Sequence, residues 1–151
     1  MKYDLPAFLN GVVSREKYRN WIDAKAASLR RRDKKHTPMP PPKSLYKEAV
    51  HKAVCDSEGK DAYTGERLDW SLIGKYENEK SKQGRRGYWK EMRLLPTIDH
   101  TTCIPGDLEF EICGLQTNDS KSWLSHEELV EFCKMVVRHS DNYKANVASR
   151  L

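Results

Sequence analysis

The chain has 151 residues, of which 38% are hydrophobic and 32% carry charge. Lysine and arginine outnumber aspartate and glutamate by 27 to 22, which gives a formal net charge of +5. The composition excludes a membrane-embedded protein and predicts a soluble, cytoplasmic protein, and the excess of positive charge favours a polyanionic partner such as nucleic acid.

A helix is predicted near the N-terminus. Ser14 can cap it through its side-chain oxygen, and apolar side chains recur at helical spacing from Tyr18 to Leu29. Basic residues gather at its C-terminal end, in the segment 29–36. There they complement the negative end of the helix dipole, and they are equally well placed to lie along a phosphate backbone.

The proline-rich segment 37–43 predicts a stiff, extended spacer. It divides the chain into parts with different expected roles. We expect residues 1–36 to form an N-terminal helical arm, residues 44–140 to form the main domain, and residues 141–151 to form a C-terminal tail.

The first half of the main domain combines a helix, a turn and a basic segment. Ser44 is the expected cap of the helix, which should stop near Gly59. The segment 61–70 predicts a tight turn between short strands. The segment 75–90 is polar, basic and interrupted by glycine, which predicts a flexible cationic loop. Its candidate phosphate contacts are Lys80, Lys82, Arg85 and Arg86, and an ordinary exposed loop is the alternative.

The stretch from Leu94 to Lys121 predicts a strand, a turn, a second strand and a helix. Strand-forming residues precede Asp99, a Pro-Gly-Asp sequence is typical of a turn, and apolar residues then alternate with polar ones. The helix is expected to begin at Asn118. Such a hairpin folded against a helix can bring the end of the first strand close to the start of the helix.

Asp99 and Asn118 would then face one site. A carboxylate and an amide carbonyl suit Mg²⁺ (or Mn²⁺), because such ions prefer oxygen ligands, keep several waters and take further oxygens from a phosphate. His100 alternates with Asp99 along the strand, so it need not be a ligand and is free to act as a base.

These residues resemble the core of a known enzyme family. The segments Ile98-Asp99-His100, Glu109 to Cys113 and Asn118 to Ser122 are similar to the ββα-metal core of HNH (His-Asn-His) endonucleases. The stretch 123–129 is similar to the one that opens the next helix in the HNH domain of RNA-guided nucleases. The resemblance covers roughly residues 63–137, and its specific part is the Asp-His…Asn-x-x-Lys-Ser skeleton.

The resemblance implies an α+β fold in which an HNH-type ββα-metal core is flanked by α-helices. It implies a hydrolase that cleaves phosphodiester bonds in DNA, with RNA left open, in which His100 is the general base and Mg²⁺ or Mn²⁺ is held by Asp99 and Asn118. Glu109 falls where the family has the middle asparagine that braces the loop. Lys121, in the first turn after Asn118, is a further candidate phosphate contact.

Many members of this family carry structural zinc, which this chain is not expected to hold. The four cysteines, Cys55, Cys103, Cys113 and Cys133, form no C-x-x-C pair, so reduced thiols are the expectation. The sequence Tyr63-Thr64-Gly65 stands where the family often has its first zinc-binding turn. We expect hydrogen bonds and packing to replace the metal there.

Two other classes of function stay open. A nucleic-acid-binding module with a degenerate ββα-metal fold would use the same basic surface without catalysis, and Glu109 in place of the family asparagine favours it. A structural or interaction protein would keep Asp99 and His100 as a satisfied polar pair in its core. Because one ββα unit cuts one strand, cleavage of both strands calls for a homodimer or a partner protein.

Overall fold

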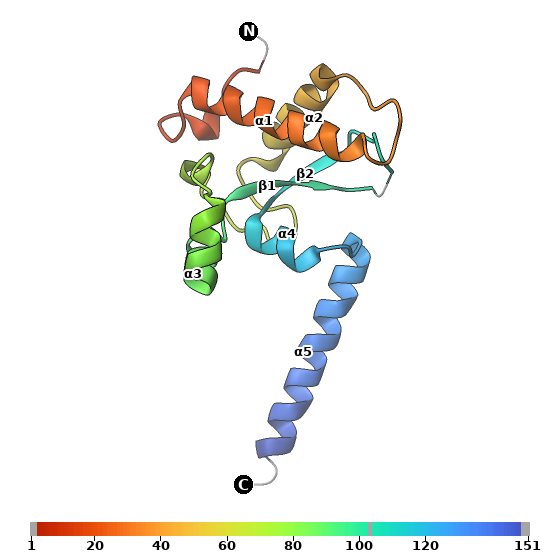
Figure 1. The fold of residues 1–151 in the computed structure, drawn as a ribbon. Coiled ribbons are helices and arrows are strands. Elements are labelled where there is room, and N and C mark those ends of the chain that lie inside the picture. The colour runs from red at the N-terminus through yellow and green to blue at the C-terminus, as the bar shows by residue number, and fades with distance from the viewer. Residues whose placement is uncertain (1–2, 103, 149–151) are drawn as a thin grey trace. The chain divides into compact units, whose positions relative to one another are not determined.

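Helices and one small antiparallel sheet make up the chain, as Figure 1 shows. The structure is a computed structural model that describes residues 3–102 and 104–148. The chain forms two compact units, Met1–Ser120 and Lys121–Leu151. The predicted α+β class is confirmed. Among the described residues, no helix is both long enough and apolar enough to cross a membrane.

Helix α1 (Arg15–Asp33) begins where the sequence predicts, because the Ser14 hydroxyl accepts a hydrogen bond from the Lys17 backbone N–H at 3.1 Å. Its apolar face is buried and consists of Tyr18, Trp21, Ile22, Ala26 and Leu29. These side chains share one core with α2 and the sheet. The expected separation of an arm at residues 37–43 is therefore not seen, since the first unit continues through that segment to Ser120.

Helix α2 (Lys43–Ser57) follows a short 3-10 helix, η1 (Ala7–Leu9), and α1 in chain order. The predicted cap at Ser44 is wrong, because the N-cap is Pro42 and Ser44 lies inside the first turn. Proline suits the start of a helix, since its fixed φ already matches and it has no N–H to satisfy. The predicted stop is confirmed by Glu58, which ends α2 in the left-handed conformation with a φ of 48°.

The segment 61–70 forms the predicted turn, but the flanking strands reduce to one isolated bridge between Lys60 and Arg67 in the described part of the chain. A second 3-10 helix, η2 (Trp70–Leu72), comes next. Trp70 is buried and packs edge-on against Trp21 of α1, with 5.6 Å between the ring centroids. The turn is therefore tied to the main core.

The predicted flexible loop at 75–90 is wrong, because Asn78–Glu91 form helix α3. Two aromatic side chains explain the helix despite its glycines. The Tyr88 hydroxyl accepts a hydrogen bond from the Glu77 N–H at 2.8 Å and so satisfies a donor at the helix start. Trp89 donates its indole N–H to the Asp119 carboxylate at 2.8 Å. Both contacts offset the cost of glycine in a helix interior.

The sheet consists of β1 (Pro96–His100) and β2 (Phe110–Gly114), paired antiparallel with Pro96 opposite Gly114 and His100 opposite Phe110. Helix α4 (Leu115–Lys121) follows β2 directly. The predicted order of strand, strand and helix is confirmed, but the helix begins at Leu115, so Asn118 lies in its middle. Helices α1 and α2 lie on one side of the sheet and α4 on the other (Figure 1).

The second unit contains helix α5 (His126–Ala148). The predicted capping box at its start is confirmed. The Ser125 N–H donates to the Glu128 carboxylate at 2.7 Å, and the Glu128 N–H donates to the Ser125 hydroxyl at 3.2 Å. The helix runs through residues 141–148, where the sequence predicts a separate tail, because no helix-breaking residue interrupts it.

Candidate functional site

The hairpin carries Asp99 and His100 on its two opposite faces. Consecutive side chains of a strand alternate between faces, and directly paired residues share a face. Asp99 pairs with Glu111, and His100 pairs with Phe110. The His100 and Phe110 rings meet edge-on at 5.0 Å, and Phe110 stacks on Tyr46 of α2. His100 thus lies on the side of α1 and α2, and Asp99 and Glu111 lie on the other face.

His100 is held by the C-terminal end of α1. The Arg32 guanidinium lies 3.3 Å from Nδ1 of His100, and a carboxylate oxygen of Asp33 lies 3.8 Å from Nε2. Because a guanidinium can only donate, Nδ1 accepts in this contact and the proton of a neutral ring sits on Nε2, whose 3.8 Å distance from Asp33 is too long for a hydrogen bond between them. Nδ1 therefore carries the lone pair that a general base needs.

Asp33 is buried at 5% exposure, and its second carboxylate oxygen accepts a hydrogen bond from the Tyr46 hydroxyl at 2.5 Å. Burial raises the pKa of Tyr46, and the adjacent Asp33 carboxylate raises it further, so the hydroxyl stays protonated as a donor. At 3.8 Å from Nε2, this carboxylate can stabilise the protonated form of the imidazole through its charge.

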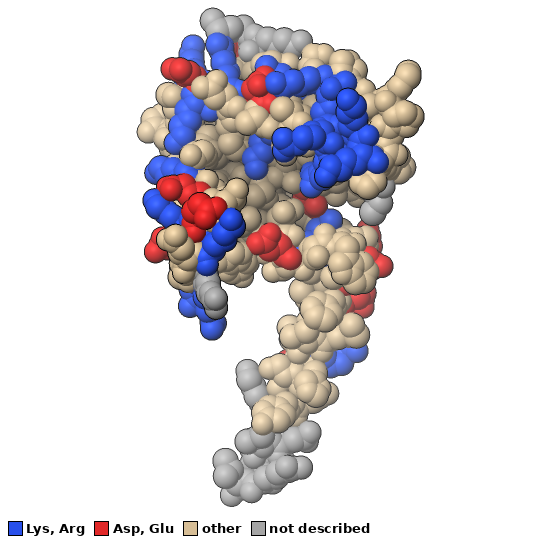
Figure 2. All heavy atoms as spheres, viewed as in Figure 1, with Lys and Arg blue, Asp and Glu red and all other residues tan. Residues whose placement is uncertain are grey.

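A patch of basic side chains covers the same end of α1, as Figure 2 shows. Its exposed members are Arg31, Arg32, Lys34 and Lys35, which we call the basic patch. Arg30 has a structural role, since it donates to the backbone carbonyl of Pro41 at 2.9 Å. The basic patch therefore adjoins His100 through Arg32. Of the two roles that the sequence allows for this segment, complementing the helix dipole or contacting phosphate, the second is favoured by the histidine beside it.

The basic residues predicted at 75–90 are less free to contact phosphate. On α3, Lys80 pairs with Glu77 at 2.7 Å and Lys82 pairs with Glu79 at 2.8 Å. Arg86 is exposed, while the side chain of Arg85 lies outside the described part of the chain. Lys121 ends α4 and is buried at 8% exposure, unlike a surface phosphate contact.

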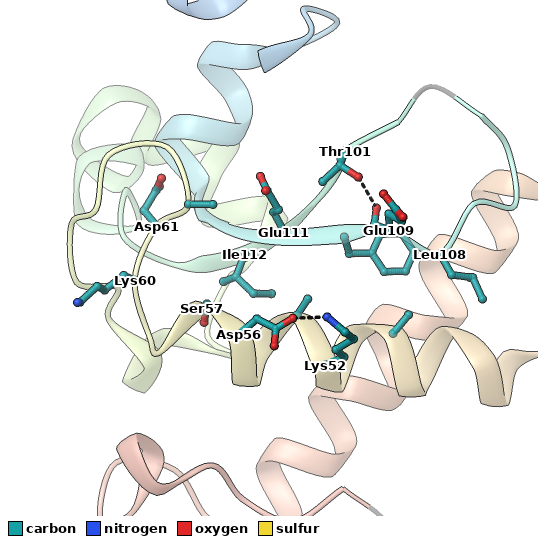
Figure 3. A pocket seen from close by; sticks show the side chains of 14 residues that line it. Lys52, Asp56, Ser57, Lys60, Asp61, Thr101, Leu108, Glu109, Glu111 and Ile112 are labelled. Atoms are coloured by element: carbon teal, nitrogen blue, oxygen red, sulfur yellow. Dashed lines mark hydrogen bonds and ion pairs between the residues drawn. The ribbon is translucent and has the colours of Figure 1, made fainter. Parts of the chain in front are cut away.

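A groove with a volume of about 570 Å³ lies along the outer edge of β2, between this strand and α2 (Figure 3). Its charged lining consists of Lys52, Asp56, Lys60, Asp61, Glu109 and Glu111. Acidic groups outnumber basic ones there, and Lys52 is already paired with Asp56 at 2.5 Å. The groove is thus poorly suited to a phosphate backbone, in contrast to the basic patch.

Glu109 braces the loop between the strands through its backbone. Its carbonyl accepts hydrogen bonds from both the N–H and the hydroxyl of Thr101, each at 3.2 Å. Farther along the loop, the Thr102 hydroxyl donates to the Asp107 carboxylate at 2.7 Å. The Glu109 side chain lines the groove instead (Figure 3), so the family-implied role of this side chain as a loop brace stays a prediction.

Asp99 is buried at 8% exposure and accepts a hydrogen bond from the Tyr63 hydroxyl. Burial raises the pKa of Tyr63, and the carboxylates of Asp99 and Glu111 raise it further. The hydroxyl therefore remains a donor that fixes the orientation of Asp99. Two carboxylates, from Asp99 and Glu111, stand side by side on this face of the sheet.

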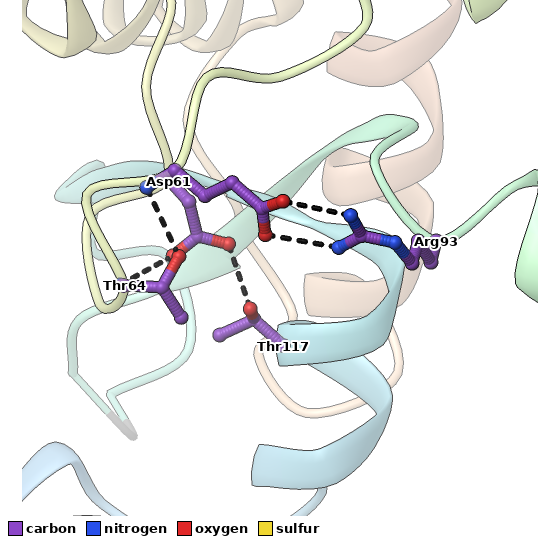
Figure 4. A network of polar contacts seen from close by, with 5 residues as sticks. Asp61, Thr64, Arg93 and Thr117 are labelled. Atoms are coloured by element: carbon purple, nitrogen blue, oxygen red, sulfur yellow. Dashed lines mark hydrogen bonds and ion pairs between the residues drawn. The ribbon is translucent and has the colours of Figure 1, made fainter.

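Tyr63 is placed by a network centred on the buried Asp61 (Figure 4). One oxygen of its carboxylate accepts the backbone N–H groups of Tyr63 at 2.8 Å and Thr64 at 3.0 Å. The other accepts the Gly114 N–H and the Thr117 hydroxyl, both at 2.7 Å. Hydrogen bonds thus tie the turn to the end of β2 and to the first half of α4.

Asp99 and Glu111, which are paired across the sheet, offer two carboxylates of the kind that a hard cation prefers. The half-buried Asn118, in the middle of α4, carries an amide oxygen that is also of a suitable kind. Within residues 3–102 and 104–148, no group of three His, Cys, Asp or Glu side chains could hold a metal ion. An ion here would depend on two protein oxygens, water and a substrate phosphate, which is a common arrangement for Mg²⁺.

The sequence reasoning places Arg32 in a basic segment and Tyr63 in a turn, but it joins neither to His100 or Asp99. It gives no role to Asp33 or Glu111. Glu111 carries a usable signal, because it lies two residues before Cys113 in an alternating strand and so shares a face with Asp99 once the register is known. Asp33 carries none, since it is 67 positions from its histidine partner and ends a helix that looks like a separate arm.

Comparisons of the chain with known protein families, with curated proteins and with solved structures found no match.

Proposed function

We propose that this chain is a metal-dependent endonuclease of the HNH type that hydrolyses phosphodiester bonds in DNA. The observation that carries the proposal is the junction of His100 with α1. One imidazole nitrogen faces a buried carboxylate, and the other meets an arginine of the basic patch. A proton acceptor beside a surface that attracts phosphate is what phosphodiester hydrolysis requires, and this supports the proposal.

In this proposal the general base lies on one face of the hairpin and the metal ligand Asp99 lies on the other. A scissile phosphate would lie across the end of β1, where Asp99 and His100 diverge. His100 takes the proton of the attacking water at Nδ1 once the phosphate has drawn Arg32 away from it, and Asp33 stabilises the resulting imidazolium. Asp99 and Asn118 would hold Mg²⁺ or Mn²⁺, which supplies charge neutralisation at the phosphate.

Nicking of supercoiled plasmid DNA by the purified chain tests the proposal. Cleavage is expected with Mg²⁺ or Mn²⁺ and should stop in EDTA. Asp99→Asn keeps an oxygen acceptor for Tyr63 but removes the charge, so it should lose cleavage while DNA binding, followed by fluorescence anisotropy, persists. A wild-type protein that binds DNA but leaves plasmid intact with both ions would overturn the nuclease proposal.

One observation favours a second candidate, a non-catalytic nucleic-acid-binding module. Both nitrogens of His100 already face protein partners, as they would in a purely structural polar cluster. Binding without cleavage in the plasmid assay is the result that this candidate predicts. Absence of binding would exclude both candidates and leave an interaction protein.

Tyr63→Phe removes the hydroxyl that orients Asp99 and leaves the ring in place. Loss of a partner that orients a metal ligand typically weakens metal affinity about 10- to 100-fold. We therefore expect the Mg²⁺ concentration for half-maximal cleavage to rise by that factor, with a smaller change in the rate at saturating Mg²⁺. A titration of the cleavage rate against Mg²⁺ concentration measures this midpoint. An unchanged midpoint would argue against Asp99 as a metal ligand.

Removing two charges of the basic patch, in Arg31→Ala/Lys35→Ala, is expected to weaken DNA binding and flatten its salt dependence. Each lost phosphate contact lowers the slope of log K against log salt concentration by about 0.9. The matched control is Lys52→Ala/Lys60→Ala in the acidic groove, which removes the same charge. Equal effects of the two variants would mean that net charge, and not the basic patch, governs binding.

A further inference from the structure

Strand β2 has an outer edge that no strand of the described sheet covers. The sheet consists of β1 and β2, so the side of β2 turned away from β1 carries no third strand. In an antiparallel ladder, residues alternate between those that bond the partner strand and those whose backbone groups point outward. Because the Thr101 N–H bonds the Glu109 carbonyl, the outward-pointing residues of β2 include Phe110 and Ile112. Both residues line the acidic groove between β2 and α2 (Figure 3).

Part of this edge is closed and part is open. At its C-terminal end, the Ala62 N–H donates to the Ile112 carbonyl at 2.9 Å. The next outward-pointing residue, Gly114, donates its N–H to Asp61. Within the described part of the chain, no hydrogen bond is made by the outward N–H of Ile112 or by the N–H and carbonyl of Phe110. An extended segment laid beside β2 can pair with these groups as an added strand.

The face of this edge that points away from α2 is acidic. Glu109 directly precedes β2 and Glu111 lies two positions later, so their carboxylates project from the same face. Among the described residues, neither forms an ion pair, whereas Lys52 is already paired with Asp56. Lys60 lies at the opposite end of the groove from Glu109 (Figure 3). Two unpaired negative charges therefore lie beside the open part of the edge.

The face toward α2 is apolar and offers small side chains. Ala49 and Ala53 of α2 border the groove there. An added strand also has two faces, because its side chains alternate along the chain. One set of its side chains would lie beside the carboxylates of Glu109 and Glu111, and the other set would pack over the two alanines.

We propose that the outer edge of β2 binds an extended segment of a partner protein by strand addition, and that this segment alternates basic with apolar residues. Lysine or arginine at every second position pairs across the strands with Glu109 and Glu111. The chain as a whole has a net charge of +5 and repels a basic segment, so the acidic groove gives the interaction its specificity. The proposal does not depend on nuclease activity.

The first test uses a short fluorescein-labelled peptide of alternating lysine and valine, titrated with the full chain and followed by fluorescence anisotropy. We expect saturable binding. A peptide of the same length that alternates glutamate and valine should bind more weakly by at least about tenfold, because its carboxylates meet those of the groove. Equal binding of the two peptides, or no binding of either, would overturn the proposal.

Backbone methylation of the peptide tests strand addition itself. Only alternate N–H groups of an added strand face β2, so methylating one set of amides should abolish binding and methylating the other set should leave it unchanged. Loss on methylation of the valine amides indicates antiparallel addition, since those residues lie opposite Phe110 and Ile112, and loss on methylation of the lysine amides indicates parallel addition. Two methylated peptides that bind alike would exclude pairing with the edge.

A charge reversal in the chain locates the site. Glu109→Lys should weaken binding of the lysine–valine peptide by about three- to tenfold. Glu91→Lys makes the same change at the exposed end of α3 and should have no effect. Circular dichroism checks that both variants keep the wild-type fold. Equal weakening by the two variants would mean that net charge governs binding and would overturn the groove as the site. These assays measure peptide binding and not cleavage, so their outcome is separate from that of the nuclease proposal.

Discussion

Replacing His100 with alanine should lower the rate of Mg²⁺-dependent plasmid cleavage by about 10² to 10⁴, the range typical of a positioned general base. The substitution removes the proton acceptor but leaves the basic patch intact, so the affinity for DNA should change little. Initial nicking rates and anisotropy titrations on the same preparation measure the two effects. A variant that cleaves at the wild-type rate would exclude His100 as the base.

Asp33→Asn tests whether the charge of Asp33 supports His100 as the base. Asparagine keeps the size of the side chain and an acceptor for the Tyr46 hydroxyl, but it removes the charge that faces Nε2 of His100. Its cleavage rate should fall between those of wild type and His100→Ala, and combining Asp33→Asn with His100→Ala should add no further loss. Additive losses would mean that Asp33 acts independently of the histidine.

Asp61→Asn is expected to reduce the free energy of unfolding by roughly 3 to 5 kcal/mol, because several buried donors lose a charged acceptor together. The amide of asparagine offers one acceptor oxygen, and its NH₂ group would face donors from Gly114 and Thr117. Urea unfolding followed by circular dichroism measures the loss. It should also reduce cleavage, since the Asp61 network places Tyr63.

Thr117→Val is the matched control for this network. It removes one hydrogen bond to Asp61 and keeps the shape of the side chain, so the expected loss is about 1 kcal/mol. An Asp61→Asn variant no less stable than Thr117→Val would show that the turn, and not the buried carboxylate, holds the end of β2 to the start of α4.

The local signals in the sequence predict local structure well. The cap at Ser14 and the capping box at Ser125 each depend on residues three positions apart, and both are present. The paired strands follow from the apolar alternation and the turn between them, and they are present too. Helix α3 has no such signal, because it depends on Trp89 and the distant Asp119. The sequence of α3 contains two glycines and many charged residues. Without the tertiary contact, such a segment is predicted to be a loop.

In the candidate site, too, some residues could be predicted from the sequence and others could not. Asp99, His100 and Asn118 stand in one recognisable stretch of sequence, which makes them visible without a structure. The contacts that would tune them come from elsewhere: Asp33 from the end of α1, and Tyr63 from a turn. Those side chains look ordinary in the sequence, because an aspartate at a helix end and a tyrosine in a turn have no pattern of their own.

The contact between α1 and His100 joins residues 68 positions apart in the chain. A protein made from its N-terminus onward therefore cannot complete this junction until β1 has left the ribosome, and Asn118 follows later still. If the chain is a nuclease, a partly synthesised molecule carries the basic patch without a competent centre. Removing the first 36 residues would strip His100 of both groups that now face its ring, and it would also expose the core that α1 shares with α2 and the sheet.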